Sequence, residues 1–304
     1  MKLVTYRDIF GERSCRLGVL VNEMVIDVER LARHANVELP SSMLGLIDSG
    51  PSGLEALKIL ISEYVDKWPV GTAMATSNVR LMAPIPRPRK NIFGIGLNYI
   101  DHVDESSRSL DTDKNLPEKP VVFSKPPTSV VGPTDPIEHN ATITQQLDWE
   151  VELGVIIGKT AKRIEESDAM TCVFGYTVIN DVSARDNRRA GQWIFSKGQD
   201  TYCPMGPCIV TADEIDDPHR LKLSLKKNGV IKQDANTAQM YFRIPRLIAD
   251  IASAITLEPG DIIATGTPAG VGAGRVPQEW MVPGDVIEAF VEGIGTLRNP
   301  VVAV

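Results

Sequence analysis

Three acidic side chains with a regular spacing give the strongest chemical signal in the sequence. Asp148, Glu150 and Glu152 alternate with apolar residues in the segment DWEVELGVIIG. In a β-strand these side chains would share one face, with about 6.5 to 7 Å between successive positions. A solvated strand face has the same alternation. The uninterrupted apolar run that follows favours a strand that enters the core, with carboxylates at its rim that either raise their pKa or hold a cation.

A further carboxylate follows a second apolar run. The segment FGYTVIND places Asp181 at the end of a predicted strand. An Asp in this position is usually a cap or turn residue. Together with Glu150 and Glu152 it would complete a site of three carboxylates, which suits Mg²⁺ or Mn²⁺ and leaves positions for water or substrate.

Other candidate residues have weaker signals. His102 and Glu105 lie three residues apart in LNYIDHVDES. On a helical turn the carboxylate would orient the imidazole and raise its basicity, although a surface His beside acidic residues gives the same pattern. Lys197 in FSKGQD and Thr267 in ATGTPAG would not be chosen from the residues alone. The four cysteines form no C-x-x-C pair and have no zinc-type spacing with the four histidines, so we expect reduced, buried thiols.

The elements that must position these residues are mostly short strands. From Asn91 onward, apolar runs of strand length are separated by Gly and Pro, with few helical stretches such as SDAMTC and PRLIADIASAI. This density predicts a β-rich core and disfavours a Rossmann domain. The Gly-rich segment ATGTPAGVGAG also lacks the G-x-G-x-x-G register and the P-loop lysine.

The chain divides by pattern into two parts. Residues 1–80 resemble a small α/β module, with strand-like runs SCRLGVLV and EMVIDV and helical spacing in ERLARHA and from Leu54 to Trp68. Residues 81–90 are rich in proline and predict a linker, because proline neither continues a helix nor sits in a central strand. Residues 91–304 would then form the second domain, in which the polar segment 106–120 predicts a mobile surface loop.

Composition limits the classes of partner. The 304 residues have a formal net charge of -7, so no nucleic-acid or membrane-surface partner is expected. No stretch approaches the roughly 20 apolar residues of a membrane span, and the first residues lack the layout of a signal peptide. We therefore expect a soluble, cytoplasmic protein.

The order of eight segments resembles the fumarylacetoacetate hydrolase superfamily. They extend from about Asn91 to the C-terminus and are GIGLNYIDH, VFSKPP, GPTDPI, LDWEVELGVIIGK, GYTVINDVSARD, KGQDTYCPMGP, DIIATGTPAGVG and GDVIEAFVEGIGTLRNPV. The chain is most similar to the group of acylpyruvate, fumarylpyruvate and maleylpyruvate hydrolases and oxaloacetate decarboxylases. The resemblance implies an α+β, mainly β fold, the β-sandwich roll of the family with a small N-terminal α/β module, usually as a homodimer.

The resemblance also implies a role for each candidate residue. The implied metal ligands are Glu150, Glu152 and Asp181, the implied catalytic residues are His102 and Glu105 on a mobile lid together with Lys197, and the implied substrate-binding residues are Arg185, Lys197 and Thr267. Arg188 stands where many members have Gln. Its charge would favour a substrate with an acidic distal end, or it would face solvent.

The implied function is a metal-dependent hydrolase that cleaves a C–C bond in 2,4-diketo acids of the acylpyruvate, fumarylpyruvate or maleylpyruvate type. Mg²⁺ or Mn²⁺ would chelate the carboxylate and keto oxygen of a small 2-oxo acid substrate, and Lys197 would stabilise the resulting pyruvate enolate. His102, polarised by Glu105, would activate the attacking water. Oxaloacetate decarboxylation, or tautomerisation or isomerisation of a 2-oxo acid, stays an alternative because it uses the same enolate. A non-catalytic 2-oxo acid binding protein is a remote alternative.

Overall fold

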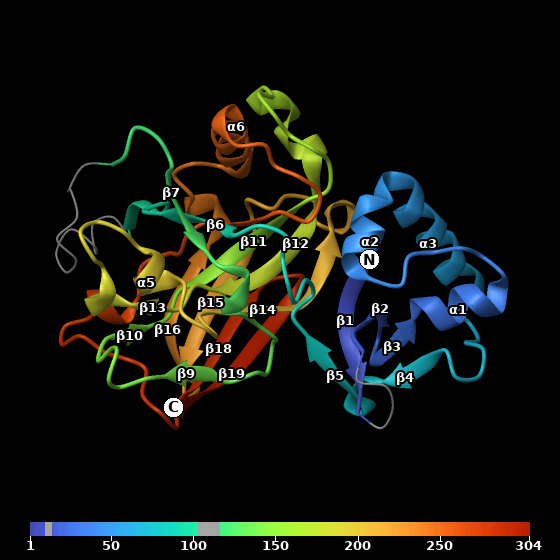
Figure 1. Cartoon of the computed structure of the whole chain (residues 1–304), viewed down its shortest axis with the longest axis horizontal. Helices are drawn as coiled ribbons and strands as arrows, with labels where there is room; N and C mark the ends of the chain where they lie inside the picture. The colour runs from blue at the N-terminus through green and yellow to red at the C-terminus, as the bar shows by residue number, and fades with distance from the viewer. Residues whose placement is uncertain (10–13, 102–115) are drawn as a thin grey trace.

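The computed structural model describes residues 1–9, 14–101 and 116–304 (Figure 1). Its largest sheet has 12 strands. In chain order these are β1 (Lys2–Asp8), β2 (Arg16–Val21), β3 (Met24–Asp27), β4 (Ala73–Ala75), β5 (Val79–Met82), β6 (Ile92–Gly96), β7 (Val121–Lys125), β8 (Val130–Val131), β11 (Val151–Ile157), β12 (Val173–Asn180), β14 (Cys203–Thr211) and β17 (Ile262–Ala264). The strands follow the order β4-β3-β2-β1-β14-β12-β11-β17-β6-β7, with β5 paired to β1 and β8 to β14.

A second sheet has five strands in the order β16-β15-β18-β19-β9, and a short pair joins β10 to β13. Their bounds are β9 (Ile137–His139), β10 (Leu147–Asp148), β13 (Ser183–Ala184), β15 (Lys222–Lys227), β16 (Val230–Asn236), β18 (Val286–Val291) and β19 (Gly295–Ala303). Most strand pairs are antiparallel, which agrees with the exclusion of a Rossmann domain. The predicted α+β, mainly β fold is confirmed.

Helices are few and lie outside the sheets (Figure 1). The α-helices are α1 (Val28–Ala35), α2 (Met43–Asp48), α3 (Gly50–Tyr64), α5 (Ile194–Lys197) and α6 (Ile244–Ala254). The 3-10 helices are η1 (Thr76–Asn78), η2 (Pro127–Ser129), η3 (Glu166–Cys172), η4 (Arg185–Asn187), η5 (Ala212–Glu214), η6 (Thr237–Gln239) and η7 (Gly272–Gly274). The helical runs ERLARHA, 54–68 and PRLIADIASAI thus correspond to α1, α3 and α6, whereas SDAMTC forms the 3-10 helix η3. No helix of the described chain is both long enough and apolar enough to cross a membrane.

The start of α1 shows how a buried charge stabilises the N-terminal region. Asp27 caps the helix by accepting from the backbone N–H of Arg30. The Asp27 carboxylate is fully buried, and it also accepts from the Tyr6 hydroxyl (2.6 Å) and from Nε of Arg16 (2.7 Å). Burial would raise the pKa of Asp27, but the hydrogen bonds from Arg16 and Tyr6 outweigh it and lower that pKa.

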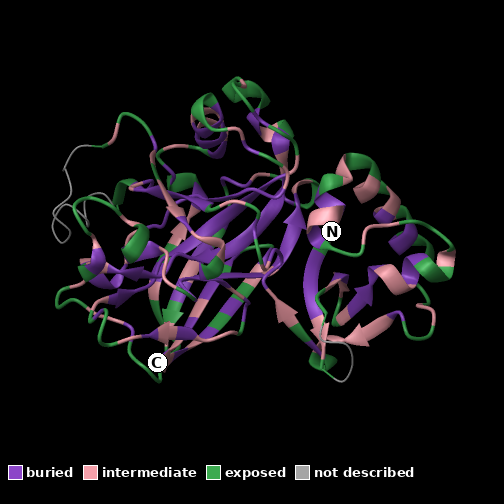
Figure 2. Ribbon diagram, in the orientation of Figure 1, coloured by how far each residue is buried: buried purple, intermediate pink, exposed green. Residues whose placement is uncertain are grey.

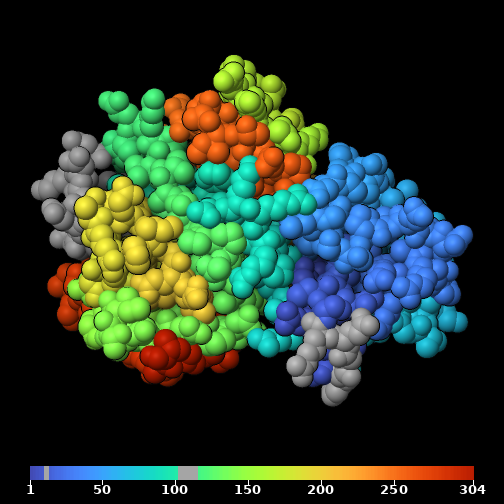
Figure 3. Space-filling model, in the orientation of Figure 1, coloured from blue at the N-terminus to red at the C-terminus, as the bar shows by residue number. Residues whose placement is uncertain are grey.

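The N-terminal region extends the large sheet. Its strand β1 pairs with β14, and Figure 3 shows this region packing directly against the rest of the molecule. Ile85, within the predicted linker, is fully buried. The division into 1–80 and 91–304, with 81–90 as linker, stays a prediction.

The site depends on the centre of the large sheet. All seven residues of β11 are buried between β12 and β17, as the buried central strands in Figure 2 show. This burial explains the continuous apolar run GVII. Cys172, Cys203 and Cys208 are buried free thiols, as expected. Cys15 is exposed; it precedes the first residue of β2 and is not part of the strand.

Candidate active site

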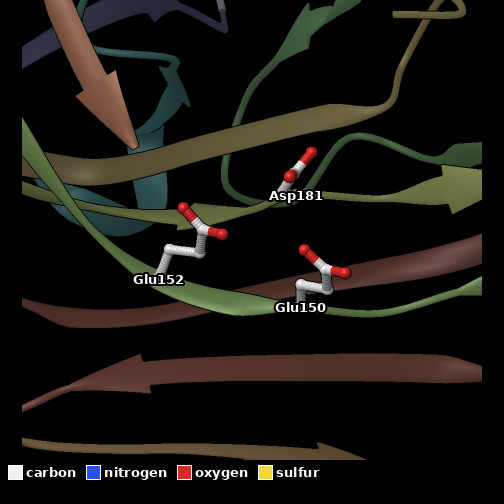
Figure 4. Close-up of side chains that lie close together, drawn as sticks. All are labelled: Glu150, Glu152 and Asp181. Carbon is white, nitrogen blue, oxygen red and sulfur yellow. The ribbon is translucent and has the colours of Figure 1, made fainter. Parts of the chain in front are cut away.

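Three carboxylates meet at the end of the central strands. Glu150, Glu152 and Asp181 each offer an oxygen within 4.8 Å of the others, and Figure 4 shows their carboxylates around a common space. The antiparallel pair of Val151 with Asn180 places the start of β11 beside the end of β12, and so brings Asp181 to the two glutamates. The three side chains are only 4%, 1% and 0% exposed. The interpretation of this acidic alternation as a solvated strand face is therefore wrong.

Side chains shape the backbone of the acidic segment. Three consecutive N–H groups, from just after the end of β10 to the first residue of β11, donate to side-chain oxygens instead of to the backbone of a neighbouring strand. They are Trp149 to Asp148 Oδ1 (2.8 Å), Glu150 to Asn180 Oδ1 (3.0 Å) and Val151 to Gln233 Oε1 (2.9 Å). These bonds satisfy backbone donors where the ladder is interrupted. The segment is therefore held by polar side chains rather than by regular strand pairing.

Lys197 and Arg185 bind the carboxylates directly. The ammonium of Lys197 donates to Glu150 Oε2 and to Asp181 Oδ2, both at 2.7 Å. Arg185 donates through Nη2 to Glu150 Oε1 (2.6 Å) and through Nε to Asp148 Oδ2 (2.8 Å). Burial lowers the pKa of each cation, but the neighbouring carboxylates outweigh it and raise both pKa values. Both residues are therefore positively charged beside the acidic cluster.

Glu152 differs from the other two carboxylates. Its Oε2 accepts from the backbone N–H of Gly266 (3.0 Å), whereas its buried Oε1 has no hydrogen-bond partner among the described residues. Burial first, and then the charges of Asp181 and Glu150, raise the pKa of Glu152 well above its ordinary value. A buried oxygen that accepts from no described residue, in a cluster of carboxylates, fits a ligand of Mg²⁺ or Mn²⁺.

Thr267 lies next to this cluster, directly after Gly266. Its buried hydroxyl donates to the carbonyl of Val151 (2.9 Å) and accepts from Nε2 of Gln233 (2.8 Å). These contacts attach the loop to the backbone between the two glutamates. A contact of Thr267 with substrate stays a prediction.

The structure does not place every predicted residue. His102 and Glu105 lie outside the described residues, as does most of the predicted loop 106–120. Tyr99, shortly before them, is buried, and its hydroxyl has no partner in the described part of the chain. Burial, and then the charge of Glu152, raise the pKa of Tyr99. Arg188 is half-buried, with its guanidinium carbon 4.7 Å from the centroid of the Trp193 ring.

Sequence reasoning missed two residues of this site, Lys125 and Gln233. Lys125 Nζ donates to Asp181 Oδ1 (2.5 Å), and the Gln233 amide bonds to both Val151 and Thr267. The alternation in VVFSK offered a signal for Lys125, because it shares a strand face with Phe123. Gln233 had no comparable signal, since its partners are distant in sequence.

Comparisons with known proteins show which family the chain resembles over most of its length. Residues 91–302 match the family model described as fumarylacetoacetate (FAA) hydrolase, C-terminal. The chain is 40% identical over 292 residues to the oxaloacetate tautomerase YisK of Bacillus subtilis (strain 168). The aligned residues cover 94% of this chain and 95% of that protein. The solved structure of a fumarylacetoacetate hydrolase (EaFAH) from the psychrophilic Exiguobacterium antarcticum is 37% identical, with a TM-score of 0.82 over the full length of both chains. A maleylpyruvate hydrolase from Sphingobium sp. SYK-6, solved with manganese(II) and pyruvate, is 31% identical over 100% of this chain and 99% of that one, with a TM-score of 0.79.

Proposed function

Since this chain belongs to the fumarylacetoacetate hydrolase family, we propose that it is a divalent-metal-dependent tautomerase that interconverts the enol and keto forms of oxaloacetate-type 2-oxo acids. The observation that carries the proposal is the 40% identity, over 94% of the chain, to a protein named as an oxaloacetate tautomerase. This similarity supports the tautomerase alternative better than the C–C bond hydrolase expected from the sequence.

The reaction removes one proton from the substrate and adds one at another atom, without any redox change. In the enol-to-keto direction the enol O–H bond breaks and a C–H bond forms at C3. Negative charge develops on the enolate oxygen between these events, so a positioned cation lowers the barrier. Glu150, Glu152 and Asp181 would hold a divalent cation, which would supply Lewis-acid polarisation of the 2-oxo acid.

The residues of the chain supply the other requirements. Lys197 is held by Glu150 and Asp181, so its ammonium is oriented beside the space between the carboxylates, where it stabilises the enolate oxygen. Arg185, fixed by Asp148 and Glu150, adds a second positive charge for an anionic substrate. The proton at C3 needs a separate acid or base, and His102 remains the predicted group.

Hydrolysis of 2,4-diketo acids is the second candidate. The likeness to the maleylpyruvate hydrolase solved with manganese(II) and pyruvate favours it. Tautomerisation and hydrolysis both pass through an enolate that involves C3 of the substrate. Hydrolysis also requires a water molecule activated beside the distal carbonyl. Decarboxylation of oxaloacetate needs neither a water nor the enol as substrate.

One experiment separates the three activities. Freshly dissolved enol-oxaloacetate is mixed with the protein and Mn²⁺ or Mg²⁺, the ultraviolet absorbance of the enol is followed, and pyruvate and CO₂ are measured in the same samples. We expect the enol to decay faster than in protein-free solution, without matching release of CO₂, and Glu150→Gln to lose this acceleration. An acylpyruvate is assayed in parallel, and its cleavage together with uncatalysed enol decay would instead favour the hydrolase. Accelerated release of CO₂ from oxaloacetate would favour the decarboxylase.

Two further properties stay predictions. Calorimetric titration with Mn²⁺ and Mg²⁺ tests metal binding and the preferred ion, and chelation should abolish the acceleration. The homodimer implied by the family is tested by light scattering.

A further inference from the structure

Lys125 is a fully buried lysine in direct contact with the carboxylate site. Its side chain is 0% exposed and its ammonium donates to Asp181 Oδ1 at 2.5 Å. The same ammonium donates to the main-chain carbonyl of Lys197, and it lies 3.4 Å from the carbonyl oxygen of Val182. The three donors of this ammonium thus face three acceptors, which a charge buried this deeply requires.

The two ammonium groups at Asp181 have different kinds of partner. Lys125 bonds to one carboxylate oxygen and to two main-chain carbonyls, that of Val182, just before β13, and that of Lys197, the last residue of α5. Lys197 bonds to the side chains of Glu150 and Asp181. Rotation of a single side chain therefore cannot move the main-chain acceptors of Lys125, whereas it can move either acceptor of Lys197.

This difference separates the two oxygens of Asp181. Oδ1 is bound by Lys125, whereas Oδ2 shares the ammonium of Lys197 with Glu150 and so faces the other carboxylates. We propose that Lys125 is a positioning residue that holds Asp181 as a monodentate metal ligand through Oδ2 and fixes the end of α5, where Lys197 lies. The proposal rests on the metal site of the proposed function.

Two effects of removing Lys125 must be distinguished. The loss of its positive charge increases the attraction of the cluster for a dication, whether or not Asp181 moves. The loss of its hydrogen bond frees Asp181 to rotate, and partners of this kind typically change metal affinity by about 10- to 100-fold. Only the second effect depends on the Asp181 carboxylate.

A double-mutant cycle isolates the positioning effect. The Kd for Mn²⁺ is measured by electron paramagnetic resonance for the parent, Lys125→Met, Asp181→Asn and the double variant. We expect the fold-change caused by Lys125→Met to differ by about tenfold or more between the parent and the Asp181→Asn variant, and the spectrum of bound Mn²⁺ to change in Lys125→Met. Lys90→Met, which removes an ion-paired lysine bound to Asp261 (3.0 Å) and Glu258 (2.6 Å), is the matched control and should leave the spectrum unchanged.

Other results would contradict the positioning role of Lys125 or the metal site on which it rests. Equal fold-changes in both backgrounds would assign Lys125 a charge effect alone and overturn the proposal. A parent that binds no Mn²⁺ would refute the metal site itself, which is a different failure. If Lys125→Met does not fold, infrared difference spectra of the parent on addition of Mg²⁺ provide the test, with Asp181→Asn identifying the band. A monodentate carboxylate band from Asp181 is expected, and a bidentate band would overturn the assignment.

Discussion

Replacing Gln233 with Met should destabilise the protein by removing one amide that connects the two sheets. Gln233 lies on β16 and is 1% exposed. Its Oε1 accepts from the N–H of Val151 (2.9 Å), and its Nε2 donates to Thr267 Oγ1 (2.8 Å) and to the carbonyl of Pro268 (2.8 Å). Met has a similar size but can make none of these bonds, so the substitution tests the amide rather than the volume.

The magnitude follows from the partners that remain. Each hydrogen bond contributes about 1 kcal/mol net, and a buried N–H left without an acceptor costs about 1–3 kcal/mol. Val151 loses its acceptor, whereas Thr267 keeps its bond to the Val151 carbonyl. The apolar Met side chain offsets part of the loss because its burial is favourable. We therefore expect the free energy of unfolding to fall by about 2–4 kcal/mol.

Urea unfolding of the metal-free protein measures this difference. Gln278→Met is the matched control, because Gln278 is exposed and donates one bond, to the Ala273 carbonyl (3.1 Å); it should change stability by less than about 0.5 kcal/mol. A cycle with Thr267→Val should give a coupling energy of about 0.5–3 kcal/mol. A Gln233→Met protein as stable as the parent, or no coupling with Thr267→Val, would refute the argument.

Three other predictions concern the stability of the protein and the chemistry of the candidate site. Without metal, Glu152→Gln should be no less stable than the parent, since burial and the charges of Asp181 and Glu150 outweigh the attraction of Lys197 and raise the pKa of Glu152. Glu150→Gln should lose about 3 kcal/mol with its two buried ion pairs, and both variants should weaken Mn²⁺ binding in calorimetry. The lowered pKa of Asp27 means that the unfolded chain binds its proton more readily, so this contribution to stability is present above about pH 4 and is lost as the pH falls toward the folded pKa; urea unfolding of Asp27→Asn across this range should lack that loss. Lys197→Met should slow enol decay, decarboxylation and acylpyruvate cleavage together, whereas His102→Ala should reduce acylpyruvate cleavage by about 10² to 10⁴ and decarboxylation by less, measured as kcat/KM at fixed Mn²⁺.

The strands were predictable because their signals are local. Mostly apolar runs correspond to β11, β12 and β17, which are buried along almost their whole length, and Glu152 is the one charged residue in these three strands. The pairing of β1 with β14 was not predictable, since it joins residues about 200 positions apart and leaves no periodic trace in either strand. The exposed Cys15 shows a related limit, because burial depends on packing as well as on residue type.

In the candidate site, too, some residues were predictable from the sequence and others were not. Glu150 and Glu152 were predictable from a spacing of two, and Asp181 from its place after a strand, because antiparallel neighbours bring a strand start beside a strand end. Lys125, which donates to Asp181, comes from β7, and Gln233, which binds the backbone between the two glutamates, comes from β16. Their positions along the chain contain no trace of these contacts. Yet a cluster of buried carboxylates cannot persist without compensating charge, so cations had to be present around it. The family resemblance named two of these cations, Lys197 and Arg185, whereas the third, Lys125, required the fold.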